Sequence, residues 1–373
     1  MLAVAAVLAS LLATSTGGSR EAADYRTGAE TWRSAERGFA GWRLAGGAAV
    51  DARGVLCLAA GAPAGEALSP VVRTGFEARE AVPSWNAATP AGTCVEARLR
   101  ARVAGRWTRW YELGVWSSRD GARRHSVAGQ RDARGRVATD TLVLAAGADA
   151  LQLALRLRSE RGGASPSLRL AAVAFSAAPK RPRMLAAGDR SLWGRLLDVP
   201  RYSQMVYPDG GEVWCSPTSV AMVVAYWQRD RGAPEPRVRR AVRGVYDGVY
   251  RGHGNWSFNV AFAATQGLDA RVARLASLRD VERWVAAGVP VVLSYAWRPG
   301  QLAGSSGSSD GHLGVVVGFD RSGNPVVNDP AARSDAAVRR TYRRAQLERL
   351  WLEHSGGTVY LIHPPRHRVP PLP

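Results

Sequence analysis

The chain has 373 residues, of which 46% are hydrophobic, so a largely disordered protein is excluded and two domains of ordinary size are expected. Its formal net charge is +19, carried almost wholly by arginine, with Lys180 as the only lysine. These charges are scattered along the sequence and accompany no nucleic-acid motif, which argues against specific nucleic-acid binding. No segment approaches the roughly 20 consecutive apolar residues of a membrane helix, so no transmembrane segment is expected.

The first residues have the texture of a secretion signal. An apolar run from Leu2 to Leu12 is followed by small residues, although no Lys or Arg precedes it. We therefore expect residues 1–19 to be a signal peptide and the mature protein to be secreted or associated with the cell envelope. A plain Ala-rich helix is the alternative.

From residue 24 to 176 the sequence predicts an all-β sandwich domain. Short alternating runs, such as CVEARLRARV, WTRWYELGVW, TDTLVLA and LQLALRLRSE, are separated by Gly, Asp, Asn and Pro turns. In LQLALRLRSE the leucines occupy every second position and share one face of a strand. We expect the leucine face to be packed and the opposite face to be wet.

The tryptophans of this first domain allow two interpretations. They could stack on the rings of a cell-surface polysaccharide, or they could fill the core of the sandwich, which is the commoner use of buried aromatic residues. The residues concerned are Trp42, Trp85, Trp107, Trp110 and Trp116. Core filling is the simpler interpretation, and the ligand of this domain stays open.

A polar segment at 177–195 that carries two prolines predicts an interdomain linker. A second domain is expected over 196–365, followed by a proline-rich tail at 366–373. In the second domain SPTSVAMVVAYWQR and VERWVAAG predict helices, whereas VPVVLSYAW, HLGVVVGFD and PVVND predict strands. The second domain is therefore expected to be of the α+β class.

Three cysteines in an exported protein leave at least one without a disulfide partner. Cys57 and Cys94 lie in the first domain, where a disulfide between them is one option. Cys215 stands alone at the start of a predicted helix. Backbone N–H groups and the helix dipole favour a thiolate there, and the thiolate is the nucleophilic form. A buried and inert cysteine is the alternative.

A cysteine nucleophile needs a base, and His312 is the strongest candidate because a predicted strand would hold it rigidly. His253, between glycines in RGHGN, is the competitor as base or substrate contact. A Gly-bearing turn at 322–324 leads into a second strand that ends at Asp329. A hairpin would bring this carboxylate beside His312, where it could fix the imidazole tautomer. Asn328 is the alternative orienting residue.

The motifs YSQM, WCSPTS, DGHLGVVVGF and NDP together resemble those of cysteine peptidase family 39, a papain-like group that includes bacteriocin-leader peptidases. The resemblance covers about residues 196–363. It implies a papain-like fold and the catalytic residues Cys215, His312, Asp329 and Gln204. In that family the glutamine helps to form the oxyanion hole, so the Gln204 amide and the Cys215 backbone N–H would stabilise the developing oxyanion.

Two features depart from the pattern of that family. Ser216 replaces the usual glycine after the nucleophile, which could narrow substrate access or alter the local turn. The insertion PDGGEVW lengthens the approach from Gln204 to the nucleophile. Neither feature removes a reacting group, so a competent site is expected.

The resemblance implies a cysteine peptidase that hydrolyses peptide or cell-wall peptide amide bonds with no metal or organic cofactor. The N-terminal apolar run adds the expectation that this enzyme is secreted. An acyltransferase or transglutaminase-like enzyme would use the same residues and replace water with an amine acceptor. From a different class, a cell-surface polysaccharide-binding protein would carry an inactive peptidase-like module. The sequence leaves these alternatives open.

Overall fold

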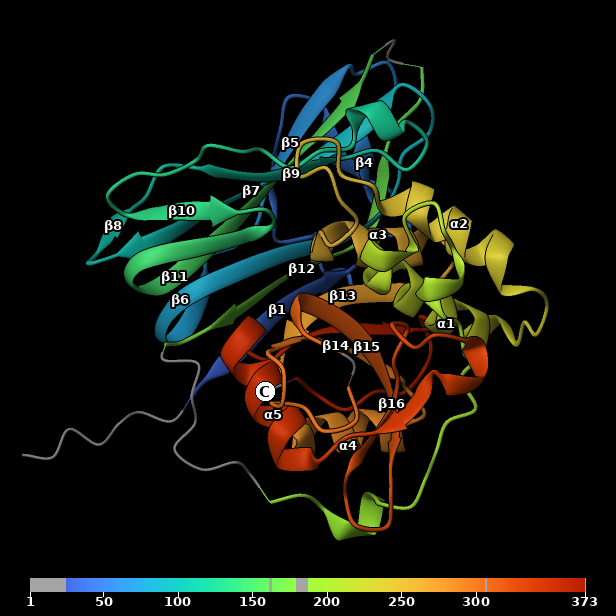
Figure 1. Cartoon of the computed structure of the whole chain (residues 1–373). Coiled ribbons are helices and arrows are strands. Elements are labelled where there is room, and N and C mark those ends of the chain that lie inside the picture. The colour runs from blue at the N-terminus through green and yellow to red at the C-terminus, as the bar shows by residue number, and fades with distance from the viewer. Residues whose placement is uncertain (1–24, 161–162, 179–186, 306, 373) are drawn as a thin grey trace, which may run out of the picture.

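The computed structural model of the chain describes residues 25–160, 163–178, 187–305 and 307–372 (Figure 1). The expected signal peptide at 1–19 lies outside the described residues, as does the stretch 179–186 of the expected linker. In the described part of the chain, no helix is both long and apolar enough to cross a membrane.

The N-terminal half is rich in β-strands. In chain order these are β1 (Thr27–Arg33), β2 (Arg43–Ala45), β3 (Ala48–Val50), β4 (Leu56–Leu58), β5 (Ala64–Leu68), β6 (Val72–Ala88), β7 (Thr93–Val103), β8 (Arg106–Trp107), β9 (Tyr111–Trp116), β10 (Gly135–Ala138), β11 (Thr141–Ser159) and β12 (Ser167–Ser176). All belong to one 12-stranded system whose main path runs β2-β5-β11-β6-β12-β4-β3. The long strands β6 and β11 pair with different neighbours along their lengths, so the sheet branches.

The strand β11 differs from the two separate runs that the sequence predicts. Register shifts on either side of Ala148 replace the expected turn, so one strand of 19 residues continues through it. The leucine face is buried, as expected. The opposite face is only partly wet, because Gln152 is also buried and its side chain accepts hydrogen bonds from Arg100 at 3.0 and 2.6 Å.

The C-terminal half combines helices with a second sheet. Its elements are α1 (Cys215–Gln228), α2 (Pro234–Val245), α3 (Trp256–Thr265), β13 (Asp269–Arg274), α4 (Leu278–Ala286), β14 (Val291–Trp297), β15 (Ser309–Phe319), β16 (Pro325–Asn328), β17 (Arg339–Thr341), α5 (Arg344–Ser355) and β18 (Thr358–His363). The 6-stranded sheet has the order β13-β18-β14-β15-β16-β17. This half is therefore α+β, as the sequence predicts.

Helices cover both faces of the second sheet, and the alternation of side chains along β15 explains how. Val315 and Val317 belong to the hydrophobic cluster that contains residues of α1, α2 and α3. Val316, between them, points to the other face and belongs to the cluster with residues of α4 and α5. An apolar run without alternation is the pattern of a strand that is buried on both faces.

The two halves share the larger hydrophobic cluster, although a separate core for each domain was expected. The larger hydrophobic cluster takes residues from both halves, because α3 packs against β6 and β13 packs against β6 and β12 (Figure 1). The ring of Phe258 in α3 lies 6.3 Å from that of Trp85 and 5.6 Å from that of Trp116. The Asn86 side chain also bridges the halves, since it donates to the Ala270 carbonyl at 2.5 Å and accepts from the Ala270 N–H at 3.1 Å.

The tryptophans considered for sugar stacking are mostly core residues. Trp42, Trp85 and Trp116 are buried. Trp107 and Trp110 are partly exposed, and the Arg100 guanidinium lies over their rings at 4.5 and 4.7 Å. These contacts support core filling, and these five residues form no row of open rings for a polysaccharide.

Cys57 and Cys94 are free thiols, so the disulfide considered between them is not formed. Cys57 lies in β4 opposite Ala49, whereas Cys94 lies in β7 opposite Arg158 of β11. The order of the sheet therefore gives the two cysteines different neighbours. Burial raises the pKa of both thiols.

The described ends of the linker and tail are fastened to the second half. After the linker, Leu196 forms a bridge with Gly318 of β15. In the tail, the His367 ring nitrogen Nε2 lies 2.7 Å from the Ala287 carbonyl, and its ring packs edge-on against Trp227. Both segments thus contribute to the packing of the C-terminal half.

Candidate active site

Cys215 is the first residue of α1, as the sequence predicts. Trp214 precedes the helix and provides no side-chain cap, so the first N–H groups and the positive end of the helix dipole lie at the thiol. Pro217 has no N–H to leave unpaired in this first turn. The Cys215 side chain lines a cavity of about 890 Å³, which is the size of pocket that encloses a small ligand or part of a peptide.

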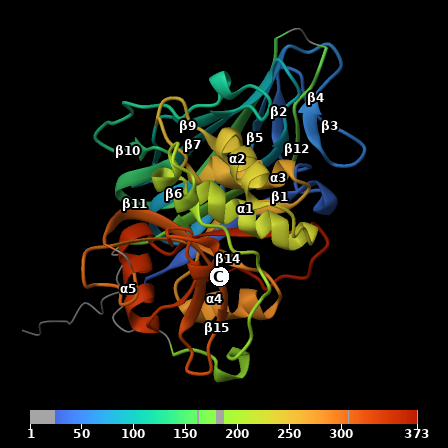
Figure 2. The same ribbon diagram turned by 45° about the vertical axis from the view of Figure 1, so that its right-hand side comes forward.

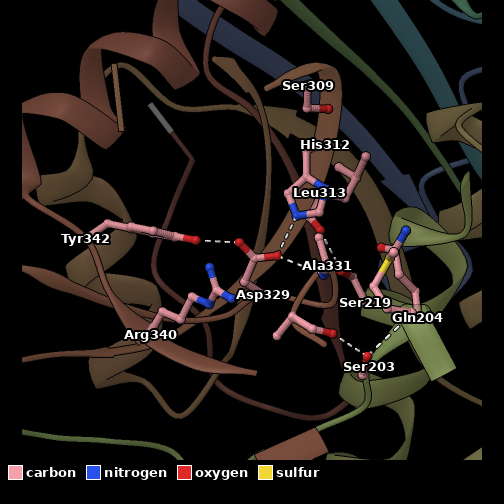
Figure 3. A network of polar contacts seen from close by, with 12 residues as sticks. Ser203, Gln204, Ser219, Ser309, His312, Leu313, Asp329, Ala331, Arg340 and Tyr342 are labelled. Carbon is pink, nitrogen blue, oxygen red and sulfur yellow. Dashed lines mark hydrogen bonds and ion pairs between the residues drawn. The ribbon is translucent and has the colours of Figure 1, made fainter. Parts of the chain in front are cut away.

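His312 is buried in β15 and lines the same cavity. Its Nε2 lies 2.8 Å from Asp329 Oδ1 (Figure 3). This leaves the other ring nitrogen, Nδ1, for the hydrogen bond with the Cys215 thiol. The rings of Tyr295 and Trp297 meet the imidazole edge-on, each at 5.3 Å between centroids. The strand and these two rings together restrict rotation of the imidazole.

The charges of the site are coupled. Burial opposes a positive His312, but the Asp329 carboxylate and the Cys215 thiol outweigh burial and raise the pKa of His312 to about 10. Burial also opposes a negative Asp329, yet the imidazole, the Tyr342 hydroxyl and a backbone N–H hold the pKa of Asp329 well below its usual range. The site therefore favours an imidazolium next to a carboxylate, and an imidazolium stabilises a neighbouring thiolate.

Asp329 follows β16 directly, and the β15–β16 hairpin places it behind His312 as expected. Its Oδ2 accepts a hydrogen bond from the Tyr342 hydroxyl at 2.5 Å, and its Oδ1 accepts the Ala331 N–H at 2.9 Å (Figure 3). Sequence reasoning missed Tyr342. Its only signal is one aromatic residue in the arginine-rich run RRTYRR.

The alternative orienting residue, Asn328, points elsewhere. Its amide donates to the carbonyls of Val199 and Pro200 at 3.3 and 3.0 Å, and its Oδ1 accepts from Arg339 at 3.1 Å. Asn328 thus fastens the chain that leads into the second half. The carboxylate of Asp329 is the group that meets His312.

His253, the competing base, lies in the loop before α3 and lines the same cavity as Cys215. Its Nδ1 is buried without a hydrogen-bond partner in the described residues. Burial, assisted by the charge of Arg124, lowers the pKa of His253. No carboxylate among the described residues hydrogen-bonds to this ring, so its position fits a substrate contact better than a general base.

Gln204 is buried and lines the same cavity. Its Nε2 donates to the Gly211 carbonyl at 2.7 Å, and Gly211 belongs to the insertion that the sequence shows before the nucleophile. A Cβ on Gly211 would lie 2.1 Å from the Gln204 carbonyl oxygen, so the insertion needs a glycine to pack there. The second N–H of the amide remains for another acceptor.

Ser216 does not narrow the cavity. Its side chain is buried, and its Oγ lies 2.9 Å from the Tyr360 hydroxyl of β18. The serine is therefore turned into the interior and ties α1 to the sheet. It is not among the residues that line the cavity of Cys215.

The N-terminal half supplies one wall of this cavity, which the sequence did not indicate. Residues 138–141, at the turn between β10 and β11, line it together with Cys215 and His312. Asp140 fixes this turn, because its buried carboxylate accepts the N–H of Trp256 at the start of α3 and the Thr141 hydroxyl. The site thus lies between the two halves.

Comparison with known families gives two matches. The family described as Peptidase C39 N-terminal domain matches residues 18–176, and the family described as Peptidase_C39 like matches residues 196–359. The chain matches none of the curated proteins. With the two matches in this order, the chain carries a C39-like cysteine peptidase domain behind its β-rich N-terminal half.

Proposed function

We propose that this protein is an exported cysteine peptidase that hydrolyses peptide amide bonds through Cys215, His312 and Asp329. The observation that carries the proposal is the buried His312–Asp329 hydrogen bond at 2.8 Å, in a cavity that Cys215 also lines. The family match supports the same chemistry. Export rests on the N-terminal sequence alone.

In the proposed reaction the Cys215 thiolate attacks the substrate carbonyl and forms a tetrahedral intermediate. The His312 imidazolium then donates its proton to the leaving amine, and the C–N bond breaks to leave a thioester on Cys215. The neutral imidazole next accepts a proton from water, whose oxygen attacks the thioester. Release of the acid restores the thiolate and imidazolium. Asp329 holds the ring and stabilises its charge throughout.

The second N–H of the Gln204 amide and the backbone N–H of Cys215 are the proposed donors to the oxyanion. Gln204 lines the cavity and is held by Gly211 at 2.7 Å, so its amide is oriented before substrate binds. A donor of this kind contributes about 2.7–4 kcal/mol to transition-state stabilisation.

We also propose that the C-terminal half has the papain-like arrangement and that the N-terminal strands form a sandwich. The first proposal rests on a nucleophile at the N-terminus of α1 and a base on β15.

The side chains that line the cavity of Cys215 carry both charges, with Arg136 from one half and Glu212 from the other. These mixed charges favour a polar peptide as the substrate.

The test is product analysis with a casein-derived peptide mixture and a peptidoglycan digest. We expect new amine termini with the unaltered protein and none with Cys215→Ala or His312→Ala. Cys57→Ala is the matched control, since it removes a cysteine far from the cavity and should keep activity. Cleavage by Cys215→Ala, or no cleavage of either mixture by the unaltered protein, would contradict the proposal.

Addition of an amine such as glycine amide distinguishes hydrolysis from acyl transfer. A hydrolase gives free acids, because water resolves the thioester. If the amine were incorporated in place of water at most cleaved bonds, the protein would be an acyltransferase that uses the same residues.

A further inference from the structure

A second cavity, of about 1360 Å³, lies away from Cys215 between the β-rich half and the helices α2 and α3. Gln204, Cys215 and His312 do not line it. The helix α3 packs against β6 of the first half, and α2 packs on α3 (Figures 1 and 2). The packing of the two halves thus creates two separate cavities.

The charged side chains that line this second cavity, among the described residues, are all arginines. Among the described residues that line it there is no Asp or Glu, although the chain has 31 acidic residues. The cavity of Cys215, by contrast, mixes both signs. The arginines that line the second cavity are Arg53, Arg119, Arg124, Arg169, Arg240 and Arg243.

Three of these six arginines bind carbonyl or carboxylate oxygens of the protein itself. Arg124 is buried and donates to three carbonyl oxygens, and burial lowers the pKa of its guanidinium to about 10. Arg169 pairs with Asp269, and Arg53 pairs with Asp51. Arg124 and Arg169 thus join segments of the two halves, whereas Arg53 pairs locally at the surface.

The other arginines of the set, Arg119, Arg240 and Arg243, are exposed and form no ion pair with any described residue. Asp120, next to Arg119 in the sequence, is paired with Arg123, which also binds Glu160. Positive charge therefore remains uncompensated at the cavity, where the low dielectric of the walls strengthens its field.

The positions of these three arginines suit a chain with several anionic groups. Arg240 and Arg243 are three residues apart in α2, so they project from the same face of the helix. Arg119 comes from the opposite half of the protein. The volume far exceeds that of a single inorganic ion, and each guanidinium can bind one anionic group in a bidentate manner.

The aromatic residues of the cavity argue against stacked rings in the ligand. Trp116 and Phe262 line it but are both buried, so neither offers an open face. Single-stranded nucleic acids and sugars are usually bound by stacking on such faces. Recognition here would depend on charge, and a phosphate group accepts hydrogen bonds from guanidinium groups on different sides.

We propose that this cavity binds a flexible chain that carries several phosphate groups, held by Arg119, Arg240 and Arg243. The site is separate from that of Cys215, and its ligand is not the substrate of the proposed peptidase. Binding there would hold the enzyme on a phosphate-rich polymer while the cavity of Cys215 stays open. The proposal stands or falls independently of the peptidase activity.

The test is calorimetric titration of the full chain with linear tripolyphosphate. We expect binding that weakens as salt rises, because charged contacts are screened. The double variant R240E/R243E should bind at least about tenfold more weakly, a loss of about 1.4 kcal/mol. Arg119→Gln, on the opposite wall, should weaken binding in the same direction.

The matched control is R321E/R366E, which makes the same charge change at exposed arginines outside the cavity. It should keep the affinity of the unaltered protein, and equal thermal stability of both double variants would show that folding is intact. Orthophosphate should bind more weakly than tripolyphosphate, because it engages fewer arginines. Alkylation of Cys215 should proceed at the same rate in all variants.

Three outcomes would overturn the proposal. One is no binding of tripolyphosphate, and another is equal weakening by the cavity variant and by its control, which would indicate only net charge. The third is tighter binding of an oligogalacturonate or a single-stranded oligonucleotide. The oligogalacturonate carries carboxylates and the oligonucleotide carries bases, so tighter binding of either would assign a different class of ligand.

Discussion

At the scale of single residues, the coupling of His312 and Asp329 sets the pH range in which the site is stable. The pKa of His312 rises from 6.5 to about 10, so its contribution to stability is complete below pH 6.5 and is lost as the pH rises to about 10. The pKa of Asp329 is lowered from 3.8, so its contribution is present above pH 3.8 and is lost as the pH falls further. The pair therefore stabilises the fold most between about pH 3.8 and pH 6.5, where both contributions are present.

Asp329→Asn should remove most of this pH-dependent stability. We expect the difference in unfolding free energy between the unaltered protein and the variant to be largest at about pH 5 and to shrink toward about pH 10. Urea denaturation at a series of pH values measures it. Asp149→Asn, which alters an exposed carboxylate paired with Arg102, is the control and should show a small difference throughout. A constant difference for Asp329→Asn would contradict the assigned charges.

In the proposed mechanism the Gln204 amide stabilises the oxyanion and does not activate the Cys215 thiol. Gln204→Ala should lower kcat by about 10²–10³-fold, because one oxyanion donor is lost. Alkylation of Cys215 should keep its rate, since no oxyanion forms in that reaction. Gln266→Ala, at a partly exposed glutamine of the second cavity, should leave kcat unchanged. A parallel loss of alkylation in Gln204→Ala would mean that the residue holds the fold of the site.

At the scale of elements, the local sequence predicts the single helices and strands of the site but not how distant strands pair. The helix after Cys215, the strand that carries His312 and the hairpin that ends at Asp329 all follow from apolar runs and turn residues. The pairing of β18 between β13 and β14 is a long-range choice that no local run encodes. The same holds for Tyr342, because the pairing of β17 with β16 is what brings its hydroxyl to Asp329.

The turn between β10 and β11 gives a test of the wall that the first half supplies. Asp140→Ala removes the acceptor for the Trp256 N–H and should lower stability by about 1–2 kcal/mol, the usual effect of losing a helix N-terminal acceptor. The turn should then move, so a bulky maleimide should label Cys215 faster relative to iodoacetamide. Asp149→Ala, in the same half but outside the cavity, is the matched control. An unchanged ratio of the two labelling rates would contradict the role of the turn.

At the scale of the whole molecule, the shared core predicts that the two halves unfold together. Phe258→Ala removes a buried ring that contacts Trp85 and Trp116 across the interface, and it should cost about 3–5 kcal/mol. Calorimetry should show one transition for the unaltered protein and one, at lower temperature, for the variant. Phe76→Ala, at a partly buried ring of the first half alone, should cost less. Two separate transitions, with only one shifted, would contradict a shared core.

The whole-molecule scale is also where the sequence was least informative. Its arginines look scattered along the chain, yet packing of the two halves gathers Arg119, Arg240 and Arg243 at one cavity. The contribution of the first half to the cavity of Cys215 is hidden for the same reason. Residues that are more than 100 positions apart meet there, as the contact of Asp140 with Trp256 illustrates.

The most direct test of the central claim is the rate at which iodoacetamide alkylates Cys215 as a function of pH. Mass spectrometry resolves Cys215 from Cys57 and Cys94, and free cysteine in the same solution is the reference thiol. We expect Cys215 to react faster than an ordinary thiol because His312 activates it, and His312→Ala to remove this advantage. If Cys215 instead reacted like an ordinary thiol, or if His312→Ala left its profile unchanged, the proposed catalytic pair would not exist.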